Sequence, residues 1–436
     1  MKSKLLRNGA IYGAANAISA AVPFLLLPVL TRALSPTDYG RVISFFMLVS
    51  LSTALAGLSV HGAVGVKWFQ RQTCDFPRFV GTAVSLAALS TLLCGLVLLA
   101  AAHLFQASLD LEPRFWFLAA AQSGATVVLG VRTALWQSQG RALNAASLQI
   151  VAAVANVGLS LAAVFALGLG GDGRIYGSVT ASLACAVLGV WFLARQHDAR
   201  WSADARDMRD LLRFGVPLIP HAVAGGLMVT ADRFSVASIL GTDQLGIYGT
   251  AGQLGMVLVV LGDAANKALS PWFYAQMALQ STRARLRVVG AAYLLLPTWL
   301  LIAIASWLFL KVAGGILIGQ RYLPAIDLSI WFLLGGALSA SYLNIVNLFF
   351  FTSKTEWLSV ATVASATVAV LLDPALARHF GLIGAAASYL CVQAVSLLLF
   401  WALSTKVKPM PWGSPMLAIR LLRNASTGAR TAGTAA

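Results

Sequence analysis

The chain has 436 residues, of which 59% are apolar and only 11% charged, whereas a typical soluble domain has about 25% charged residues. The 31 Lys and Arg against 15 Asp and Glu give a net charge of +16, but few charges lie outside the hydrophobic segments to form a nucleic-acid-binding face. The composition therefore excludes a soluble globular protein and predicts an all-α polytopic membrane protein.

Continuous apolar runs, interrupted by charged or Gly-, Pro- and Asn-rich segments, follow one another along the chain. A spanning helix needs about 20 apolar residues, and the runs lack the alternation of barrel strands. The first run is too long for the hydrophobic region of a cleavable signal, so we expect a retained span. The twelve predicted spans are roughly 9–31, 41–65, 80–103, 115–136, 147–168, 175–194, 214–239, 247–269, 288–310, 326–350, 358–376 and 382–403.

The basic residues in the connections indicate the orientation of these spans. With the N-terminus inside, 23 Lys and Arg fall on the cytoplasmic side and 7 in the outer connections, and Arg233 remains within a span. Positively charged loops stay in the cytoplasm. Both termini are therefore expected to be cytoplasmic.

Two short patterns repeat at the same offset of 206 residues. Six spans per half give both halves the same orientation, the parallel type of transporter repeat. We expect two six-helix bundles at 1–194 and 214–403 around a central cavity, a cytoplasmic linker at 195–213 and a cytoplasmic tail at 404–436. The tail contains an amphipathic stretch from Met416 to Arg423. The matching residues are Leu5-Leu6-Arg7-x-Gly9 with Leu211-Leu212-Arg213-x-Gly215, and Leu34 and Gly40 with Leu240 and Gly246.

Ionisable residues inside spans are the first candidates for function, because each costs about 2.5–3.5 kcal/mol at a helix centre. Asp232 and Arg233 lie in the outer half of span 7; they point about 100° apart, so we expect each to pair with neighbouring helices rather than with the other. In span 8, Asp263 and Lys267 have the i,i+4 spacing of a direct pair. Local neutralisation and a functional role both remain open for these residues.

Three further basic residues lie near span ends. Arg32 follows Pro28 at the outer end of span 1 and either snorkels to the interface or faces a ligand. Lys67 and Arg132 lie near cytoplasmic ends, where anchoring is the simpler interpretation. As candidates, Arg32, Arg233, Lys67, Lys267 and Arg132 bind substrate, while Asp232 and Asp263 serve in ion coupling or gating.

Prolines single out spans 1 and 7, which each contain two. A proline inside a helix removes a hydrogen bond and bends the chain, and interrupted helices at corresponding positions of two halves point to a transport site. The predicted hinge residues are Pro23, Pro28, Pro217 and Pro220. No catalytic or metal-binding motif is recognisable, and the four cysteines are too few and too scattered for a disulfide framework.

Five segments carry a family resemblance: Tyr12-Gly13, the run from Pro23 to Arg32, Leu34-Ser35-Pro36-x-Asp38-Tyr39-Gly40, Phe214 to His221, and Asp232-Arg233-Phe234. With these segments the chain resembles the bacterial polysaccharide flippases that export lipid-linked O-antigen or exopolysaccharide units, within the multidrug/oligosaccharidyl-lipid/polysaccharide exporter superfamily. Relatives that flip the peptidoglycan precursor generally have fourteen spans, and drug-exporting relatives more often place acidic residues in the first bundle; neither pattern is seen here.

The resemblance implies a polyprenyl-diphosphate-linked oligosaccharide, such as one on undecaprenyl diphosphate, flipped to the periplasmic leaflet of the inner membrane by alternating access. It also implies polymerase and chain-length proteins as membrane partners, with no nucleic acid and no cofactor. Coupling to a proton gradient, a sodium gradient or the membrane potential stays open. The alternatives are an ion-coupled small-molecule exporter, whose often cationic substrates do not suit a basic cavity, and a membrane-embedded glycosyltransferase or polymerase, which would need larger outer loops.

Overall fold

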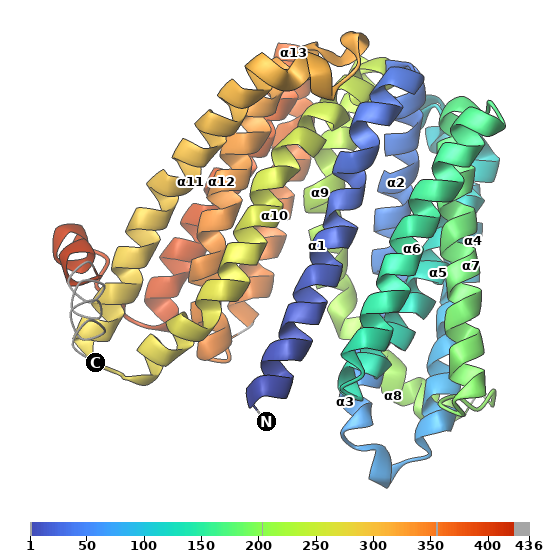
Figure 1. Cartoon of the computed structure of the whole chain (residues 1–436), viewed down its shortest axis with the longest axis horizontal. Coiled ribbons are helices and arrows are strands. Elements are labelled where there is room, and N and C mark those ends of the chain that lie inside the picture. The colour runs from blue at the N-terminus through green and yellow to red at the C-terminus, as the bar shows by residue number, and fades with distance from the viewer. Residues whose placement is uncertain (1, 203, 355, 423–436) are drawn as a thin grey trace. The chain divides into compact units, whose positions relative to one another are not determined.

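The computed structural model describes residues 2–202, 204–354 and 356–422, and within these ranges every regular element is a helix. The chain forms two compact units, one of Met1–Gly249 with Leu317–Tyr322 and the other of Thr250–Ile316 with Leu323–Ala436. The first unit contains α1 to α9 and the first turns of α10, and the second contains the remaining helices (Figure 1). The expected all-α membrane fold is thus confirmed.

The helices of the first unit are α1 (Lys2–Ala33), α2 (Pro36–Ala56), α3 (Val60–Trp68), α4 (Phe76–Leu109), α5 (Pro113–Ser138), α6 (Ala142–Leu161), α7 (Gly170–Arg195), α8 (Ala205–Gly215) and α9 (Ile219–Leu240). Those of the second unit are α10 (Thr242–Ala278), whose start belongs to the first, α11 (Thr282–Leu317), α12 (Pro324–Phe351) and α13 (Glu356–Val407). The short elements are η1 (Arg71–Thr73), the π-turn η2 (Ala162–Ala166), η3 (Val216–Leu218) and η4 (Gln320–Tyr322).

Ten described helices are long and apolar enough to span a membrane. The apolar part of α1, Ile18–Ala33, falls just short of that length. Helix α13 has 52 residues, about 78 Å of helix at 1.5 Å per residue, and kinks at Gly381, where φ is 61°. With α13 counted as two segments and α1 included, eleven of the twelve predicted spans each overlap one long helix, and the exception is the span at 41–65.

The predicted span at 41–65 differs from the structure, because the helix stops early. Helix α2 ends at Ala56, and Leu58 and Ser59 take positive φ values of 42° and 49° before α3 begins. The Leu58 carbonyl lies against Gly215, where any side chain would overlap it. A continuous apolar sequence therefore contains a tight turn that hydropathy does not reveal.

Local chemistry at the start of α2 accounts for the order of residues in the motif Leu34-Ser35-Pro36-x-Asp38-Tyr39-Gly40. Ser35 caps the helix by accepting a hydrogen bond from the Asp38 backbone N–H at 3.1 Å, and its hydroxyl donates to the Asp38 carboxylate at 2.7 Å. Pro36 occupies the first turn, where its missing N–H costs nothing. The cap fixes where α2 starts, and with it the position of Tyr39 and Gly40.

A reciprocal contact joins the starts of α2 and α10 and supports the predicted repeat. A Cβ at Gly40 would overlap the Thr242 carbonyl oxygen, and a Cβ at Gly246 would overlap the Pro36 carbonyl oxygen. Gly40 corresponds to Gly246 and Pro36 to Thr242 at the offset of 206, so the two contacts are equivalent. Both helices approach so closely because each has glycine at the crossing point. We call these four residues the glycine crossing.

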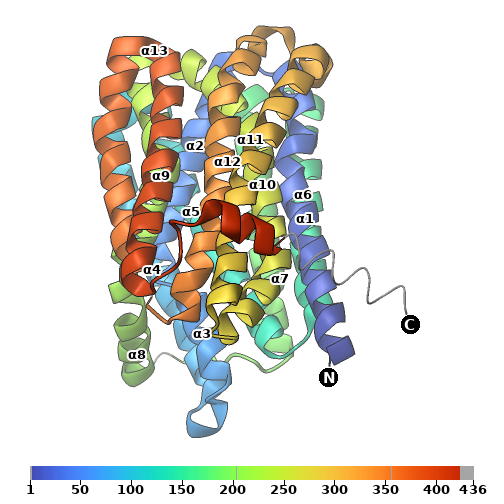
Figure 2. The same cartoon turned by 90° about the vertical axis from the view of Figure 1, so that its left-hand side faces the viewer.

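Other contacts within each unit fix the remaining elements. In the first unit α1 runs beside α6 (Figures 1 and 2). In the second, residues 415–422 form a helix that packs on α11 through Ala418, which is fully buried against Gly290 (Figure 2). The amphipathic stretch predicted at 416–423 is therefore helical as far as 422. Residues 423–436 of the predicted tail lie outside the described residues.

Candidate functional site

The two candidate residues of α9, Asp232 and Arg233, lie in the first unit, and the first of them is buried. The Asp232 side chain is 5% exposed and accepts hydrogen bonds from its neighbour's backbone N–H at 2.7 Å and from the Tyr248 hydroxyl at 2.9 Å. The Arg233 side chain is 23% exposed; one Nη lies 3.4 Å from the Asp232 carboxylate and donates to the Val229 carbonyl. The two residues therefore do pair with each other, contrary to the expectation, because the long Arg233 side chain turns back along the helix to the Val229 carbonyl and so passes the Asp232 carboxylate.

A second arginine within a span of the first unit was not singled out from the sequence. Arg174 of α7 is 9% exposed, donates to Asn156 at 2.9 Å and to Ser160 at 2.7 Å, and lies 5.0 Å from the Phe46 ring centroid. Because span 6 was predicted to start at 175, Arg174 was counted among the outer connections, whereas α7 starts at Gly170. The first unit thus carries a buried arginine in α7 as well as the partly exposed Arg233 in α9.

Arg32 ends α1 and is exposed, with one Nη donating to the Pro28 carbonyl at 2.7 Å. The neighbouring Thr31 hydroxyl accepts the Gly319 N–H at 3.0 Å, so residues 317–322 hold this end of the helix. Pro23 and Pro28 both lie inside α1, as predicted. Their role as hinges remains a prediction.

The prolines of span 7 lie elsewhere than expected. Pro217 is within η3, between α8 and α9, and Pro220 is in the first turn of α9. A proline in a first turn removes no helical hydrogen bond. These two prolines therefore mark the junction at which α9 starts, whereas Pro23 and Pro28 interrupt the inside of a helix.

Lys67 and Arg132 contact the segment that follows α7. The Lys67 side chain, 22% exposed, lies 3.6 Å from the Asp210 carboxylate. The Arg132 side chain is fully buried, with Nη atoms 2.6 Å from both Asp198 and Gln196. Because both ends of its guanidinium are already bonded, we leave Arg132 out of the site proposed below.

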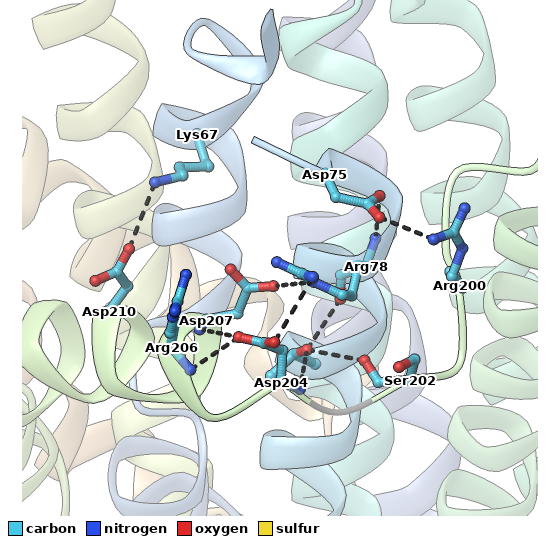
Figure 3. Close-up of polar contacts among 10 residues, drawn as sticks. Lys67, Asp75, Arg78, Arg200, Ser202, Asp204, Arg206, Asp207 and Asp210 are labelled. Atoms are coloured by element: carbon cyan, nitrogen blue, oxygen red, sulfur yellow. Dashed lines mark hydrogen bonds and ion pairs between the residues drawn. The ribbon is translucent and has the colours of Figure 1, made fainter. Parts of the chain in front are cut away.

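Residues 195–213, the predicted linker, form an ion-paired network on the first unit (Figure 3). Arg78 of α4 lies 2.9 Å from Asp207 and 3.6 Å from Asp204, and Arg200 lies 2.9 Å from Asp75. The backbone N–H groups of Asp207 and Arg206 hold the pKa of Asp204 below its usual 3.8. Every Asp of the linker is thus paired with a basic side chain of α3, α4 or α5.

The predicted pair in α10 forms in the second unit. The Lys267 Nζ lies 2.6 Å from the Asp263 carboxylate, and both side chains are more than half exposed. One turn away, the buried Asn347 of α12 donates to Asn266 at 2.8 Å and accepts at 3.3 Å from Ser270. The direct pair predicted from the i,i+4 spacing is therefore confirmed, whereas the adjoining amide cluster was not predicted, because it depends on how α12 packs on α10.

Comparison with known proteins agrees with this architecture. A family model described as "Polysaccharide biosynthesis protein" matches residues 5–277. "Lsg locus putative protein 1" of Haemophilus influenzae is 25% identical over 379 residues, covering 84% of this chain and 90% of that protein. Among solved structures, "Lipid II flippase MurJ, inward closed conformation" has a TM-score of 0.66 at 11% identity, covering 97% of this chain and 91% of MurJ. An inward-facing multidrug resistance MATE family transporter of the MOP superfamily has a TM-score of 0.66 at 13% identity, covering 91% and 94%. At such low identity the two structures show a shared fold alone.

Proposed function

The chain belongs to the polysaccharide biosynthesis protein family, and on this premise we propose that it is a flippase for polyprenyl-diphosphate-linked oligosaccharides. The lipid-linked unit moves from the cytoplasmic to the periplasmic leaflet of the bacterial inner membrane by alternating access. The chain acts as a transporter rather than an enzyme. Names of similar proteins support this proposal, since one is a lipid II flippase and another comes from an Lsg locus.

The observation that carries the proposal is the Asp232–Arg233 pair inside a membrane-spanning helix. A charged side chain within a span is costly and marks a pathway or a ligand site. Arg233 remains partly exposed while Asp232 is almost fully buried. The guanidinium is therefore the member of the pair that a ligand can reach.

A basic site suits a diphosphate. Moving its negative charges unaided into hydrocarbon costs tens of kcal/mol by Born solvation, and guanidinium groups replace that lost hydration with bidentate hydrogen bonds. Arg233 and the exposed Arg32 are the groups that we assign to the diphosphate. Lys67 and Lys267, whose ion pairs are only partly buried or exposed, remain proposed contacts nearer the cytoplasmic end.

The acidic partners supply a means of coupling. When the diphosphate binds the Arg233 guanidinium, Asp232 loses its ion pair but keeps its hydrogen bond from the Tyr248 hydroxyl. Its carboxylate is then available to bind a proton or sodium ion. Asp263 plays the corresponding part beside Lys267. Outward movement of two negative charges is favoured by about 4.6 kcal/mol at an inside-negative potential of 100 mV, so the membrane potential alone suffices as a driving force.

The orientation of the chain is part of the proposal. Both termini and residues 195–213 face the cytoplasm, where proteins that make the substrate act, and polymerase and chain-length proteins receive the product outside. Cysteine labelling in a cysteine-free background tests this. Asp243→Cys, exposed at the start of α10, should react with impermeant reagent from outside; reaction only from the inside overturns the orientation.

A reconstituted flipping assay tests the function itself. Proteoliposomes carry a fluorescent polyprenyl diphosphate oligosaccharide, and dithionite destroys fluorescence only in the outer leaflet. We expect the purified chain to make nearly all of the labelled diphosphate lipid accessible, but not a labelled phosphatidylcholine. Equal flipping of both lipids, or of neither, contradicts the proposal.

The second candidate, a small-molecule exporter, has the shared MATE fold in its favour. The same proteoliposomes loaded with a cationic dye discriminate the two functions. Dye movement driven by a proton or sodium gradient, without flipping of the diphosphate lipid, would identify the exporter instead.

A further inference from the structure

The two acidic residues of helix α8 pair with basic side chains of the first unit. Asp207 lies 2.9 Å from Arg78, and Asp210, whose side chain is 59% exposed, lies 3.6 Å from Lys67. Leu211, one turn beyond Asp207, is fully buried. Asp207 and Leu211 thus form the packed side of α8, and both acidic residues already have a cationic partner.

The arginines of α8 lie away from its packed side. Arg206, Arg209 and Arg213 have the spacing i, i+3, i+7, which places them within a sector of about 60° on a helix. All three side chains are exposed. Among the described residues, none of the three guanidinium groups takes part in an ion pair with a carboxylate within 4.0 Å. We call these three residues the arginine stripe.

The stripe lies immediately before a membrane-spanning segment. Helix α8 continues through η3 into α9, which carries the candidate span Ala222–Leu240. Within η3, the side chains of Val216 and Leu218 are 49% and 38% exposed. Exposed apolar side chains at the edge of a span belong in the interfacial region of a bilayer. The arginine stripe is therefore at the level of lipid headgroups.

We propose that the arginine stripe binds the phosphate groups of anionic phospholipids in the cytoplasmic leaflet. Basic residues beside a spanning helix are attracted to anionic lipid by about 1 kcal/mol each, which corresponds to about a fivefold change in binding. Arginine also offers a fork that matches phosphate oxygens. The occupant is a bilayer lipid, since the stripe is continuous with the membrane-facing apolar residues.

A local reporter tests the binding. The full chain has Cys74, Cys94, Cys185 and Cys391 replaced by Ala and a fluorophore attached at Ala205→Cys, an exposed position at the start of α8. Phosphatidylcholine nanodiscs contain a small fraction of headgroup-spin-labelled phosphatidylglycerol or phosphatidylcholine. We expect stronger quenching by phosphatidylglycerol. Each Arg→Gln variant should lower this preference about fivefold, and the triple variant should lose it.

A charge-matched control separates the stripe from the general effect of net charge. Arg283, Lys406 and Arg420 are exposed residues of the second unit, and changing all three to Gln removes the same charge. This control and the triple Arg→Lys variant of the stripe should keep the lipid preference. Thermal melting confirms that each variant is folded. If the triple variant does not fold, the single variants test the proposal in its place.

The preference should also vanish at about 1 M salt, where the Debye length is about 3 Å. An unchanged preference in the folded Gln variants, or an equal loss in the control, overturns the proposal. The assay contains no lipid-linked sugar, so its outcome is independent of whether the chain flips oligosaccharides.

Discussion

Two parts of the first unit are held in place by different interactions. The glycine crossing depends on backbone contact, whereas the linker network depends on ion pairs. At the glycine crossing, Gly40 and Gly246 bring two helix starts into contact through backbone atoms, with no charge involved. In the network, Asp198, Asp204, Asp207 and Asp210 pair with basic side chains at 2.6–3.6 Å. A backbone contact depends on shape and is insensitive to salt, whereas ion pairs depend on burial, salt and pH. The variants below test this difference.

The largest effect on stability is expected at Arg132. Replacing it by Met leaves the Asp198 carboxylate, whose side chain is only 16% exposed, without its cation. Removing one partner of a buried pair destabilises by about 3–5 kcal/mol, so the thermal midpoint of the purified protein should fall by several degrees.

The matched control for Arg132 is Arg200→Met. It breaks an equally direct pair, 2.9 Å from Asp75, but the Arg200 side chain is 66% exposed. An exposed pair contributes about 0–1 kcal/mol. If the two variants melt alike, burial is not what gives the network its strength.

The next effect is expected at the glycine crossing. Gly40→Ala places a methyl group against the Thr242 carbonyl oxygen, and such overpacking costs about 1–3 kcal/mol. Gly246→Ala should behave in the same way, because its contact with Pro36 is equivalent. Thermal melting should show equal losses that do not change with salt.

Gly225→Ala in α9 is the control, since a Cβ there would meet nothing within 4 Å. It should stabilise the helix by up to about 1 kcal/mol. Unequal losses for Gly40→Ala and Gly246→Ala would mean that the crossing is not symmetric.

Sequence patterns predicted the spans because helix formation in a membrane depends on local apolar content. They also predicted the Asp263–Lys267 pair, since an i,i+4 contact is built into one helix. The burial of Arg174 and the partners of Arg132 were not predictable, because they depend on how distant segments pack. The Asp232–Arg233 pair was not expected for a different reason. Ideal helix geometry sets the directions of the two Cβ atoms, but a long arginine side chain can turn back along the helix.

A smaller effect is expected for the Lys67–Asp210 pair. Asp210 is 59% exposed, so a double-mutant cycle with Lys67→Met and Asp210→Asn should give a coupling energy of about 0.2–1 kcal/mol. The coupling should shrink as salt rises. A coupling well above 1 kcal/mol, or one that salt does not change, would contradict the assignment of this pair as a screened surface contact.

The smallest effect concerns pH. Because the pKa of Asp204 is lowered in the folded state, its contribution to stability is full above its unfolded pKa and is lost as the pH falls through the folded value. Wild type should therefore lose more stability than Asp204→Asn below about pH 4, where Asn still caps α8 but cannot titrate. Parallel melting curves for the two proteins at every pH would show that Asp204 does not contribute.

The central claim is that Arg233 and Arg32 bind the diphosphate, and flipping by arginine variants tests it most directly. In proteoliposomes with the fluorescent diphosphate lipid, Arg233→Ala and Arg32→Ala should each reduce the flipping rate by at least about tenfold, equivalent to about 1.4 kcal/mol. Arg233→Lys should recover only part of the rate, because lysine lacks the bidentate fork. Wild-type rates in both folded alanine variants would contradict the claim.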